Sequence, residues 1–265
     1  MSPARLKGRR VLLTRPEGSA AAWRSALEAA GARVDELPLI AVRHEADQAI
    51  LREVLDGIGE YEWIVFTSAN GVRGFFERFL ERYTDIRSVG GVRFACVGPA
   101  TEAALRAYHL DSDLTPREAD GVSLARTLMT EHDVEHQKVL VVSGNLASDE
   151  LPRLLSEQGH AIVDKILVYS TGERDVSALE AAASFRREGA DLLVFASPSA
   201  VESFLHQAAS LRLEPGARQP IAVAVGSTTA EAMRRAGIPV GAIAAKPTAE
   251  GIRDAADEAL ASARA

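Results

Sequence analysis

The chain is internally duplicated, and this duplication is the feature that most limits what it can fold into. Three segments recur in the same order, and equivalent positions lie 128 or 129 residues apart, as Val11 and Val139 do. A single repeated pair at so long a period is not a solenoid, and it indicates two similar domains. The matching segments are 9–34 with 137–163, 62–79 with 191–208, and 93–110 with 221–238.

Each repeated segment has the pattern of a strand, a short loop and a helix. Continuous apolar runs of four to six residues are expected for strands that are buried on both faces. Amphipathic patterns follow the runs, and Gly31, Gly159 and Gly237 are predicted to end helices in the left-handed conformation. Strands that alternate with helices imply parallel sheets covered on both faces, so we predict two doubly wound α/β domains. The runs are VLLT, IVFTS, ACVG, VLVVS, LLVFAS and IAVAVG.

Composition narrows the class of function. The 265 residues are 47% hydrophobic and 25% charged, which is typical of a globular protein. The apolar runs are too short for a membrane helix, and strand-like residues rather than a signal-peptide core follow the basic start MSPARLKGRR. The net charge of −7 argues against a nucleic-acid binder, and the single Cys96 excludes an internal disulfide. We therefore expect a cytoplasmic protein that acts on small molecules or on other proteins, without a nucleic-acid or membrane partner.

The common catalytic motifs are missing from the sequence. It contains no G-x-G-x-x-G after a strand, no phosphate-binding G-x-x-x-x-G-K-[ST] loop and no G-x-S-x-G elbow. HDVEH, at 132–136, fits the inverted zincin motif H-x-x-E-H. It lies in a short charged stretch without a long helix or a third ligand, so we expect no metal site. A metallohydrolase remains an alternative that chelators would test.

The loops that follow the predicted strands are where function is expected, because open α/β sheets bind ligands at the carboxyl ends of their strands. Nearly all of these loops place Ser, Thr or Asn in the first turn of the next helix. Helix capping explains any one of them. Together, however, several helix N-termini with free amides and hydroxyls would bind anions without a cluster of basic residues. The loops are 14–19, 67–71, 98–102, 143–148, 197–200 and 226–231.

Six motifs follow one another along the chain, namely EWIVFTSANGV, CVGPATEAAL, SGNLASDELPRLL, ILVYST, FASPSAV and AVGSTTAEAMRRAG. In this order and spacing they resemble the uroporphyrinogen-III synthase family over residues 9 to about 260. The resemblance implies a lyase that cyclises the linear tetrapyrrole hydroxymethylbilane, with loss of water and inversion of the last pyrrole ring. The product, uroporphyrinogen III, is a precursor of haem, and the resemblance implies that no cofactor or metal is used.

The resemblance also implies the domain organisation, namely two flavodoxin-like domains joined by a two-stranded linker, with one domain inserted into the other. The duplication alone would suggest a division near 131–136. PLI (38–40) and LVY (167–169) lie at equivalent positions of the repeats and are suited to be the linker strands. The implied domains are 1–37 plus 172–265, and 42–168, with linker strands at 38–41 and 167–171.

Tyr169, in the second linker segment, matches a tyrosine that the family is thought to use in departure of the substrate hydroxyl. A phenol can donate a hydrogen bond without adding negative charge to a site that holds many carboxylates. The alternative is an ordinary strand tyrosine that packs on the domain edge.

Eight other residues are predicted to bind the substrate carboxylates. The resemblance implies this role for six of them, Arg15 is a charged candidate because it follows the first strand, and Asn145 follows the strand at 139–143. One of them, Arg15, could instead form a local salt bridge with Glu17. Two departures stand out: Ser227 replaces a proline that is frequent in the family, and Ser143-Gly144-Asn145 replaces an Arg-Gly-Glu common in bacterial members. The second departure weakens the assignment of Ser143 and Asn145. The eight are Arg15, Ser68, Asn70, Thr101, Asn145, Ser197, Thr228 and Thr229.

A second class of function stays open at this point. The same two-domain architecture could form a non-catalytic anion-binding or regulatory module, in which the Ser and Thr residues only cap helices. Loss of the linker tyrosine or an added DNA-binding segment would favour that interpretation, and the sequence has neither. We expect a monomer whose ligand is hydroxymethylbilane.

Overall fold

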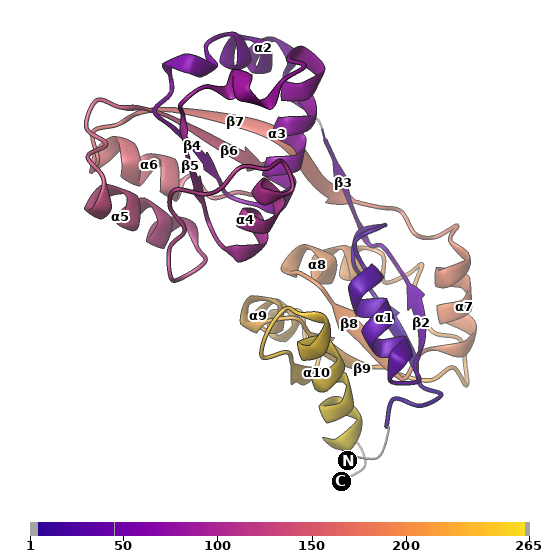
Figure 1. Cartoon of the computed structure of the whole chain (residues 1–265). Helices are drawn as coiled ribbons and strands as arrows, with labels where there is room; N and C mark the ends of the chain where they lie inside the picture. The colour runs from indigo at the N-terminus through magenta and orange to yellow at the C-terminus, as the bar shows by residue number, and fades with distance from the viewer. Residues whose placement is uncertain (1–4, 45, 263–265) are drawn as a thin grey trace. The chain divides into compact units, whose positions relative to one another are not determined.

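The computed structural model describes residues 5–44 and 46–262, which fold into two compact units (Figure 1). The described residues up to Ala41, with those from Gly172 onward, form the first unit, and Val42–Thr171 form the second. Residues 1–4 and 263–265, which the predicted first domain includes, lie outside the described residues. The chain passes between the units twice, within strands β3 (Ile40–Arg43) and β7 (Ile162–Glu173).

The first unit contains a five-stranded sheet in the order β10-β9-β8-β1-β2, and all its registered pairs are parallel. Leu12, Leu13 and Val194 are fully buried, as expected for strands covered on both faces. The order of the strands reverses between β1 and β8, which is the ligand-binding switch point of such sheets. The strands are β1 (Arg10–Leu13), β2 (Arg33–Glu36), β8 (Leu192–Phe195), β9 (Ile221–Ala224) and β10 (Val240–Ile243).

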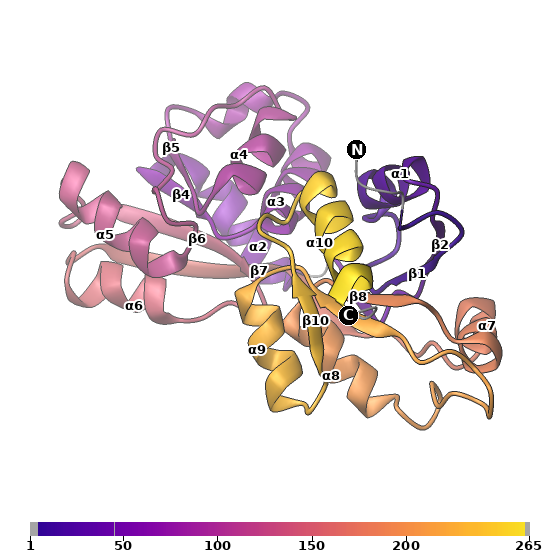
Figure 2. The same cartoon turned by 90° about the horizontal axis from the view of Figure 1, so that it is seen from below.

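Helices cover both faces of this sheet (Figures 1 and 2). α1 (Ala21–Ala29) and α10 (Ala249–Ser262) pack on each other and share one core cluster, in which Trp23 and Ile252 are buried. The other face carries a second cluster, with Phe185 and Met233, beneath the remaining three helices. These are α7 (Glu180–Glu188), α8 (Pro198–His206) and α9 (Ser227–Arg235).

The second unit has a sheet in the order β3-β7-β6-β4-β5. One face carries a phenylalanine-rich core that includes Phe66, Phe75 and Phe76, and the other a core of Leu and Val residues. Its further strands are β4 (Trp63–Phe66), β5 (Arg93–Cys96) and β6 (Lys138–Gly144). Its helices are α2 (Gln48–Asp56), α3 (Ala69–Arg82) and α4 (Pro99–Arg106) on the first face, and α5 (Gly121–Glu131) and α6 (Glu150–Glu157) on the second, with short 3-10 turns at Ile58–Glu60 and Ile86–Val89.

The duplication is visible in the topology of the two sheets. The order β7-β6-β4-β5 in the second unit corresponds to β2-β1-β8-β9 in the first. The counterpart of β10 is reduced to a parallel bridge between Leu114 and Ala95. The predicted pair of doubly wound α/β folds is thus confirmed. Every helix within residues 5–44 and 46–262 is too short or too polar to span a bilayer.

Two of the three predicted glycine helix ends have the expected backbone. Gly31 and Gly237 have φ of 90° and 71°. After α6, however, the left-handed residue is His160, with φ of 50°, so the prediction for Gly159 is wrong. Gly159 is needed for close approach instead, because a Cβ there would lie 2.7 Å from the carbonyl oxygen of Leu155.

Each passage of the chain between the units ends at a histidine–glutamate pair within one unit. His44 Nδ1 lies 2.5 Å from Glu77 Oε2 on α3, and His206 on α8 pairs with Glu173 at the end of β7. Glu77 and His206 are equivalent in the duplication, as are His44 and Glu173. The two copies therefore keep the same pair with the partners exchanged.

Candidate functional site

A pocket of about 530 Å³ opens in the first unit at the carboxyl ends of β8, β9 and β10. Polar residues at the start of α8 and α9 form one part of its lining, and Ile243, Ala244 and Pro247 form an apolar part. Three of the residues predicted to bind carboxylates, Ser197, Thr228 and Thr229, line this pocket together. Its mixture of helix N-termini, hydroxyls and apolar surface suits an anion attached to an apolar ring.

The N-terminus of α9 is the most anion-receptive feature of this pocket. Its cap residue, Gly226, offers no side chain to the first amides, and the first turn contains no acidic residue. Thr229 is only 3% exposed, and its hydroxyl makes no hydrogen bond within the described part of the chain. Thr228, beside it, is exposed. Amides without a side-chain cap, and a hydroxyl that reaches the pocket from a largely buried residue, favour a bound hydrogen-bond acceptor.

The serines before α3 and α8 act as helix caps. Ser68 Oγ accepts a hydrogen bond from the Gly71 N–H at 3.0 Å, and Ser197 Oγ accepts one from the Ala200 N–H at 3.2 Å. The capping interpretation, open at the level of sequence, therefore holds for both serines. Ser197 Oγ also lies 2.9 Å from Ser199 Oγ.

Thr101 in the second unit is the counterpart of Thr229, but its surroundings differ. It is also 3% exposed, at the start of α4. A Cβ on the cap residue Gly98 would lie 2.8 Å from the Cβ of Ala119, so the following loop covers this helix start. Pro99 lacks an N–H, and Glu102 adds a negative charge to the first turn. The two copies of the helix start are therefore unequal, and the open one is in the first unit.

Arg15 follows β1, the strand that neighbours β8 in the sheet. Its guanidinium lies 4.1 Å from the centre of the Trp23 ring, and its Nε donates to Ser19 Oγ at 3.3 Å. Glu17 pairs with Arg174 instead, so the alternative of an Arg15–Glu17 bridge is wrong. Burial lowers the pKa of Arg15, although arginine stays charged at neutral pH. Within the described residues this cation has no carboxylate partner.

Tyr169 lies in β7 of the second unit, with Gly144 of β6 as its register partner. Its half-buried ring packs against the phenylalanine-rich core, and its phenol oxygen accepts a hydrogen bond from Ser68 Oγ at 3.0 Å. The ring is thus packed against the domain, as expected if Tyr169 were an ordinary strand tyrosine. In addition, Ser68 holds its hydroxyl at the carboxyl end of β4.

The side-chain amides of Asn145 and Asn70 bind within the second unit. Asn145 accepts from the Thr171 N–H at 2.8 Å and donates to the Thr171 carbonyl oxygen at 3.1 Å. Asn70 accepts from Arg73 at 3.2 Å. Ser143, the weaker candidate, is buried and donates to the Ile166 carbonyl oxygen at 3.4 Å. These contacts give Asn145 and Ser143 a structural role that the sequence did not indicate.

The HDVEH segment does not form a cluster of ligands. His132 follows α5 and packs on Trp63, with ring centres 4.8 Å apart. His136 has a φ of 61°, and its Nε2 lies 3.7 Å from Glu135. Among residues 5–44 and 46–262, no three His, Cys, Asp or Glu side chains converge as metal ligands.

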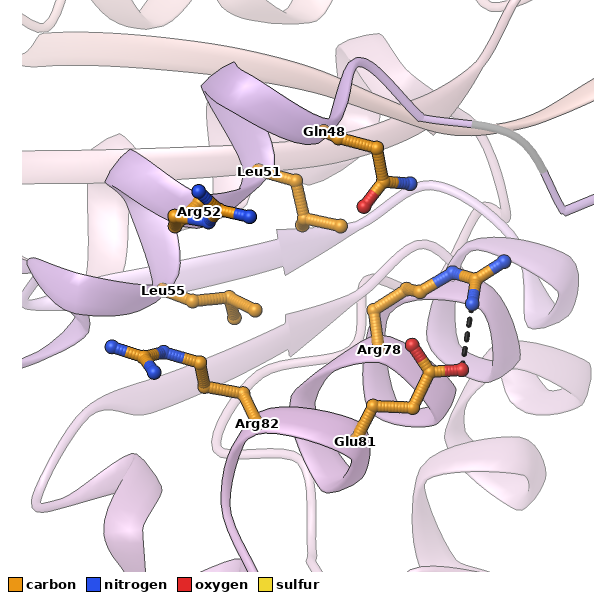
Figure 3. A pocket seen from close by; sticks show the side chains of 7 residues that line it. All are labelled: Gln48, Leu51, Arg52, Leu55, Arg78, Glu81 and Arg82. Atoms are coloured by element: carbon orange, nitrogen blue, oxygen red, sulfur yellow. Dashed lines mark hydrogen bonds and ion pairs between the residues drawn. The ribbon is translucent and has the colours of Figure 1, made fainter.

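A smaller hollow, of about 160 Å³, lies between α2 and α3 (Figure 3). Leu51 and Leu55 contribute its apolar lining, while Arg78 pairs with Glu81 at 2.6 Å. Arg82 pairs with Asp56, also at 2.6 Å. Because these two guanidinium groups already have carboxylate partners and the hollow lies away from the strand ends, it is not the candidate site.

The fold and the pocket define a duplicated two-unit α/β protein with an anion-receptive edge on its first sheet. A family profile described as "Uroporphyrinogen-III synthase HemD" matches residues 21–254. The chain therefore belongs to the uroporphyrinogen-III synthase family, whose members are cyclising lyases of haem biosynthesis. The predictions of family and of enzyme class are confirmed.

Individual relatives agree with this assignment. The chain is 30% identical to "Porphyrin biosynthesis protein HemD" of Ruminiclostridium josui over 87% of this chain, and spans 44% of that longer protein. It is 28% identical to "Uroporphyrinogen-III synthase" of Chlorobaculum parvum, over 87% of this chain and 90% of the relative.

Solved structures support the same fold. A mutant uroporphyrinogen III synthase of Thermus thermophilus has a TM-score of 0.64 at 17% identity, covering 96% of this chain and all of that one. The synthetase of Helicobacter pylori has a TM-score of 0.62 at 17% identity, covering 93% and 97%. At these identities the likeness shows the two-domain α/β fold alone.

Proposed function

We propose that this chain is a uroporphyrinogen-III synthase, which converts hydroxymethylbilane into uroporphyrinogen III with loss of water. The observation that carries the proposal is the pocket at the uncapped start of α9, where the Thr229 hydroxyl lines the pocket and makes no hydrogen bond to another described residue. The substrate is a flexible octa-anion, with four acetate and four propionate groups on apolar pyrroles. Its carboxylates therefore match the polar part of the pocket lining, and its pyrrole rings match the apolar part.

In this proposal, a substrate carboxylate binds at the start of α9. Backbone amides of the first turn and the hydroxyls of Thr228 and Thr229 would donate hydrogen bonds to it. Ser227 adds an N–H that a proline at that position would lack. Ile243 and Ala244 provide apolar surface for the attached pyrrole ring.

Arg15 is the proposed cationic contact at the same sheet edge. Its planar guanidinium can bind a carboxylate through two parallel hydrogen bonds, and no protein carboxylate competes for it within the described residues. The contact with Trp23 keeps the guanidinium in one orientation, which lowers the entropy lost when a carboxylate binds. Ser197, Asn70, Thr101 and Asn145 remain proposed secondary contacts, and their present partners favour weaker roles.

The chemistry that the proposal requires is modest. The substrate hydroxyl leaves as water after it accepts a proton, and the azafulvene that remains is attacked by the α-carbon of the last pyrrole ring that already carries the bridge to the third ring. The bond from this spiro carbon to that bridge then breaks, and the bridge carbon bonds to the free α-carbon, so that the last ring is inverted. We assign to Tyr169 the hydrogen bond that assists the leaving hydroxyl. A proton lost from the α-carbon that gains the bridge balances the one that was consumed. Because free substrate closes spontaneously to the unrotated isomer, the enzyme's main task is to hold the fold that inverts the last ring.

The test supplies freshly generated hydroxymethylbilane and separates the uroporphyrin isomers after oxidation. We expect the type III isomer, formed faster than the type I isomer in a no-enzyme control. Only type I product, at the no-enzyme rate, would refute the proposal. Substrate binding without turnover would instead support the anion-binding module.

The proposal includes a monomer that works in the cytoplasm. The single cysteine, Cys96, is buried, so the described chain presents no thiol for a disulfide between subunits. Sedimentation across a range of concentrations would test the monomer, and cell fractionation would test the compartment.

A further inference from the structure

We infer that Ser68 is a positioning residue for Tyr169, and that it directs the phenol proton toward the substrate. The inference rests on the proposed role of Tyr169 in departure of the hydroxyl. The sequence predicted that Ser68 binds a substrate carboxylate, and the inference assigns it this positioning role instead.

The hydrogen bonds around Ser68 run in one direction, from the start of α3 to the phenol. A serine hydroxyl has one proton to donate and can accept two hydrogen bonds. Ser68 Oγ accepts from the Gly71 N–H at 3.0 Å and donates its proton to the Tyr169 oxygen at 3.0 Å. The proton of the phenol itself is therefore left for a third group, which in the reaction is the leaving hydroxyl.

The start of α3 makes this arrangement electrostatically useful. No acidic residue lies in the first turn of α3, so the positive end of the helix dipole is not neutralised locally. Ser68 connects that helix end to the phenol oxygen through two successive hydrogen bonds. Negative charge that grows on the oxygen as its proton moves is therefore stabilised, since hydrogen bonds in a chain polarise one another.

The other copy of the repeat shows that this contact is more than capping. Ser197 caps α8 just as Ser68 caps α3. Ile40 stands at the position equivalent to Tyr169, so the first unit has the cap without the phenol. Helix capping alone therefore does not account for the hydrogen bond of 3.0 Å from Ser68 to the Tyr169 oxygen.

A double-mutant cycle tests the inference, using initial rates of type III product with fresh hydroxymethylbilane. We expect Ser68→Ala to lower kcat about tenfold with KM within about twofold, since a lost hydrogen bond of about 1.4 kcal/mol in the transition state is a factor of ten. Ser68→Thr, which keeps the hydroxyl, should retain most of the activity. In the Tyr169→Phe background, Ser68→Ala should have no further effect.

Asp120→Ala is the matched control for loss of a cap. Asp120 caps α5 in the same unit by accepting from the Ser123 N–H at 2.9 Å, and it takes no part in the proposed chemistry. It should lose thermal stability comparably to Ser68→Ala and keep the wild-type kcat. The inference is overturned if Ser68→Ala lowers kcat by the same factor with and without Tyr169, or if it raises only KM. A wild-type protein that makes no type III product would instead refute the proposed function.

Discussion

The ring of Tyr169 lies against Gly144, its partner across β6 and β7: a Cβ on Gly144 would fall 2.3 Å from Cζ of that ring. Glycine is required here for space rather than for an unusual φ, because even a methyl group would overlap the ring. The strand pairing and the absence of a side chain together determine where the phenol oxygen can lie, and hence whether it reaches Ser68.

We therefore expect Gly144→Ala to displace the Tyr169 ring and to lower kcat to about the level of Tyr169→Phe. Isomer analysis of the product and the far-UV circular dichroism of the variant would check activity and fold together. Gly172→Ala is the matched control. Gly172 lies in β7, the strand of Tyr169, and a Cβ there would meet nothing within 4 Å. Wild-type turnover in Gly144→Ala would contradict the role given to the ring position.

The unequal starts of α9 and α4 lead to a prediction about binding. Thr229→Val keeps the shape of the side chain and removes the hydroxyl, so we expect KM to rise at least about tenfold, as for loss of one hydrogen bond of about 1.5–3 kcal/mol to a charged group. Thr101→Val, at an equally buried position whose helix start is covered by Ala119, should raise KM by no more than about twofold. Equal effects of the two changes would argue against a dominant carboxylate site in the first unit.

The strands of both sheets could be predicted from the sequence because their signal is local. Each continuous apolar run, such as VLVVS, became a strand within one or two residues of its predicted bounds. β2 and β10 are not marked by such a run, because β2 reads RVDE and β10 reads VGAI, which is short and contains Gly241. A β-bulge between Val240 and Ala242 also interrupts its pairing with β9.

The roles of the individual polar residues could not be read from the same patterns. Ser, Thr and Asn follow nearly every strand, but their tasks depend on contacts between distant segments. Asn145 binds the backbone of Thr171, and Ala119 covers the helix start at Gly98. Arg15 stacks on Trp23 because of the path of the intervening loop. The resemblance named Tyr169, whereas its contacts with Ser68 and Gly144 became apparent only from the geometry.

Arg15→Lys should show whether carboxylate binding after β1 depends on the positive charge alone or also on the planar guanidinium. Lysine keeps the positive charge but loses the planar pair of donors and the stacking on Trp23, so we expect KM to rise about fivefold with kcat nearly unchanged. Burial lowers the pKa of Arg15, but a guanidinium stays protonated below pH 9. The titration of Arg15 should therefore not contribute to the pH dependence of the wild-type rate. Steady-state rates between pH 6 and 9 would check both points. Arg253→Lys, whose guanidinium pairs with Asp254 on α10, is the control expected to leave KM unchanged.

Asp191 should control the acid stability of the first unit. Burial opposes its ionisation, but a hydrogen bond from the Arg10 N–H at 2.9 Å and ion pairs with Arg9 and Arg218 outweigh this and lower the pKa of its carboxyl. A pKa that is lower in the folded than in the unfolded state stabilises the fold at pH values above the unfolded value of about 3.9. That stabilisation is lost as the pH falls below this value toward the folded pKa.

We therefore expect Asp191→Asn to lower the free energy of unfolding by about 2 kcal/mol at pH 7, the usual contribution of hydrogen bonds to a buried charge. The difference between wild type and variant should shrink below about pH 4, because the Asp191 carboxyl of the unfolded wild-type chain then binds a proton that the folded chain does not yet bind. Urea titrations at pH 7, 5 and 3.5 would measure this difference, with the exposed Asp254→Asn as the control. A difference that stays constant down to pH 3.5 would mean that the shape of the buried side chain, rather than its charge, stabilises this end of the sheet.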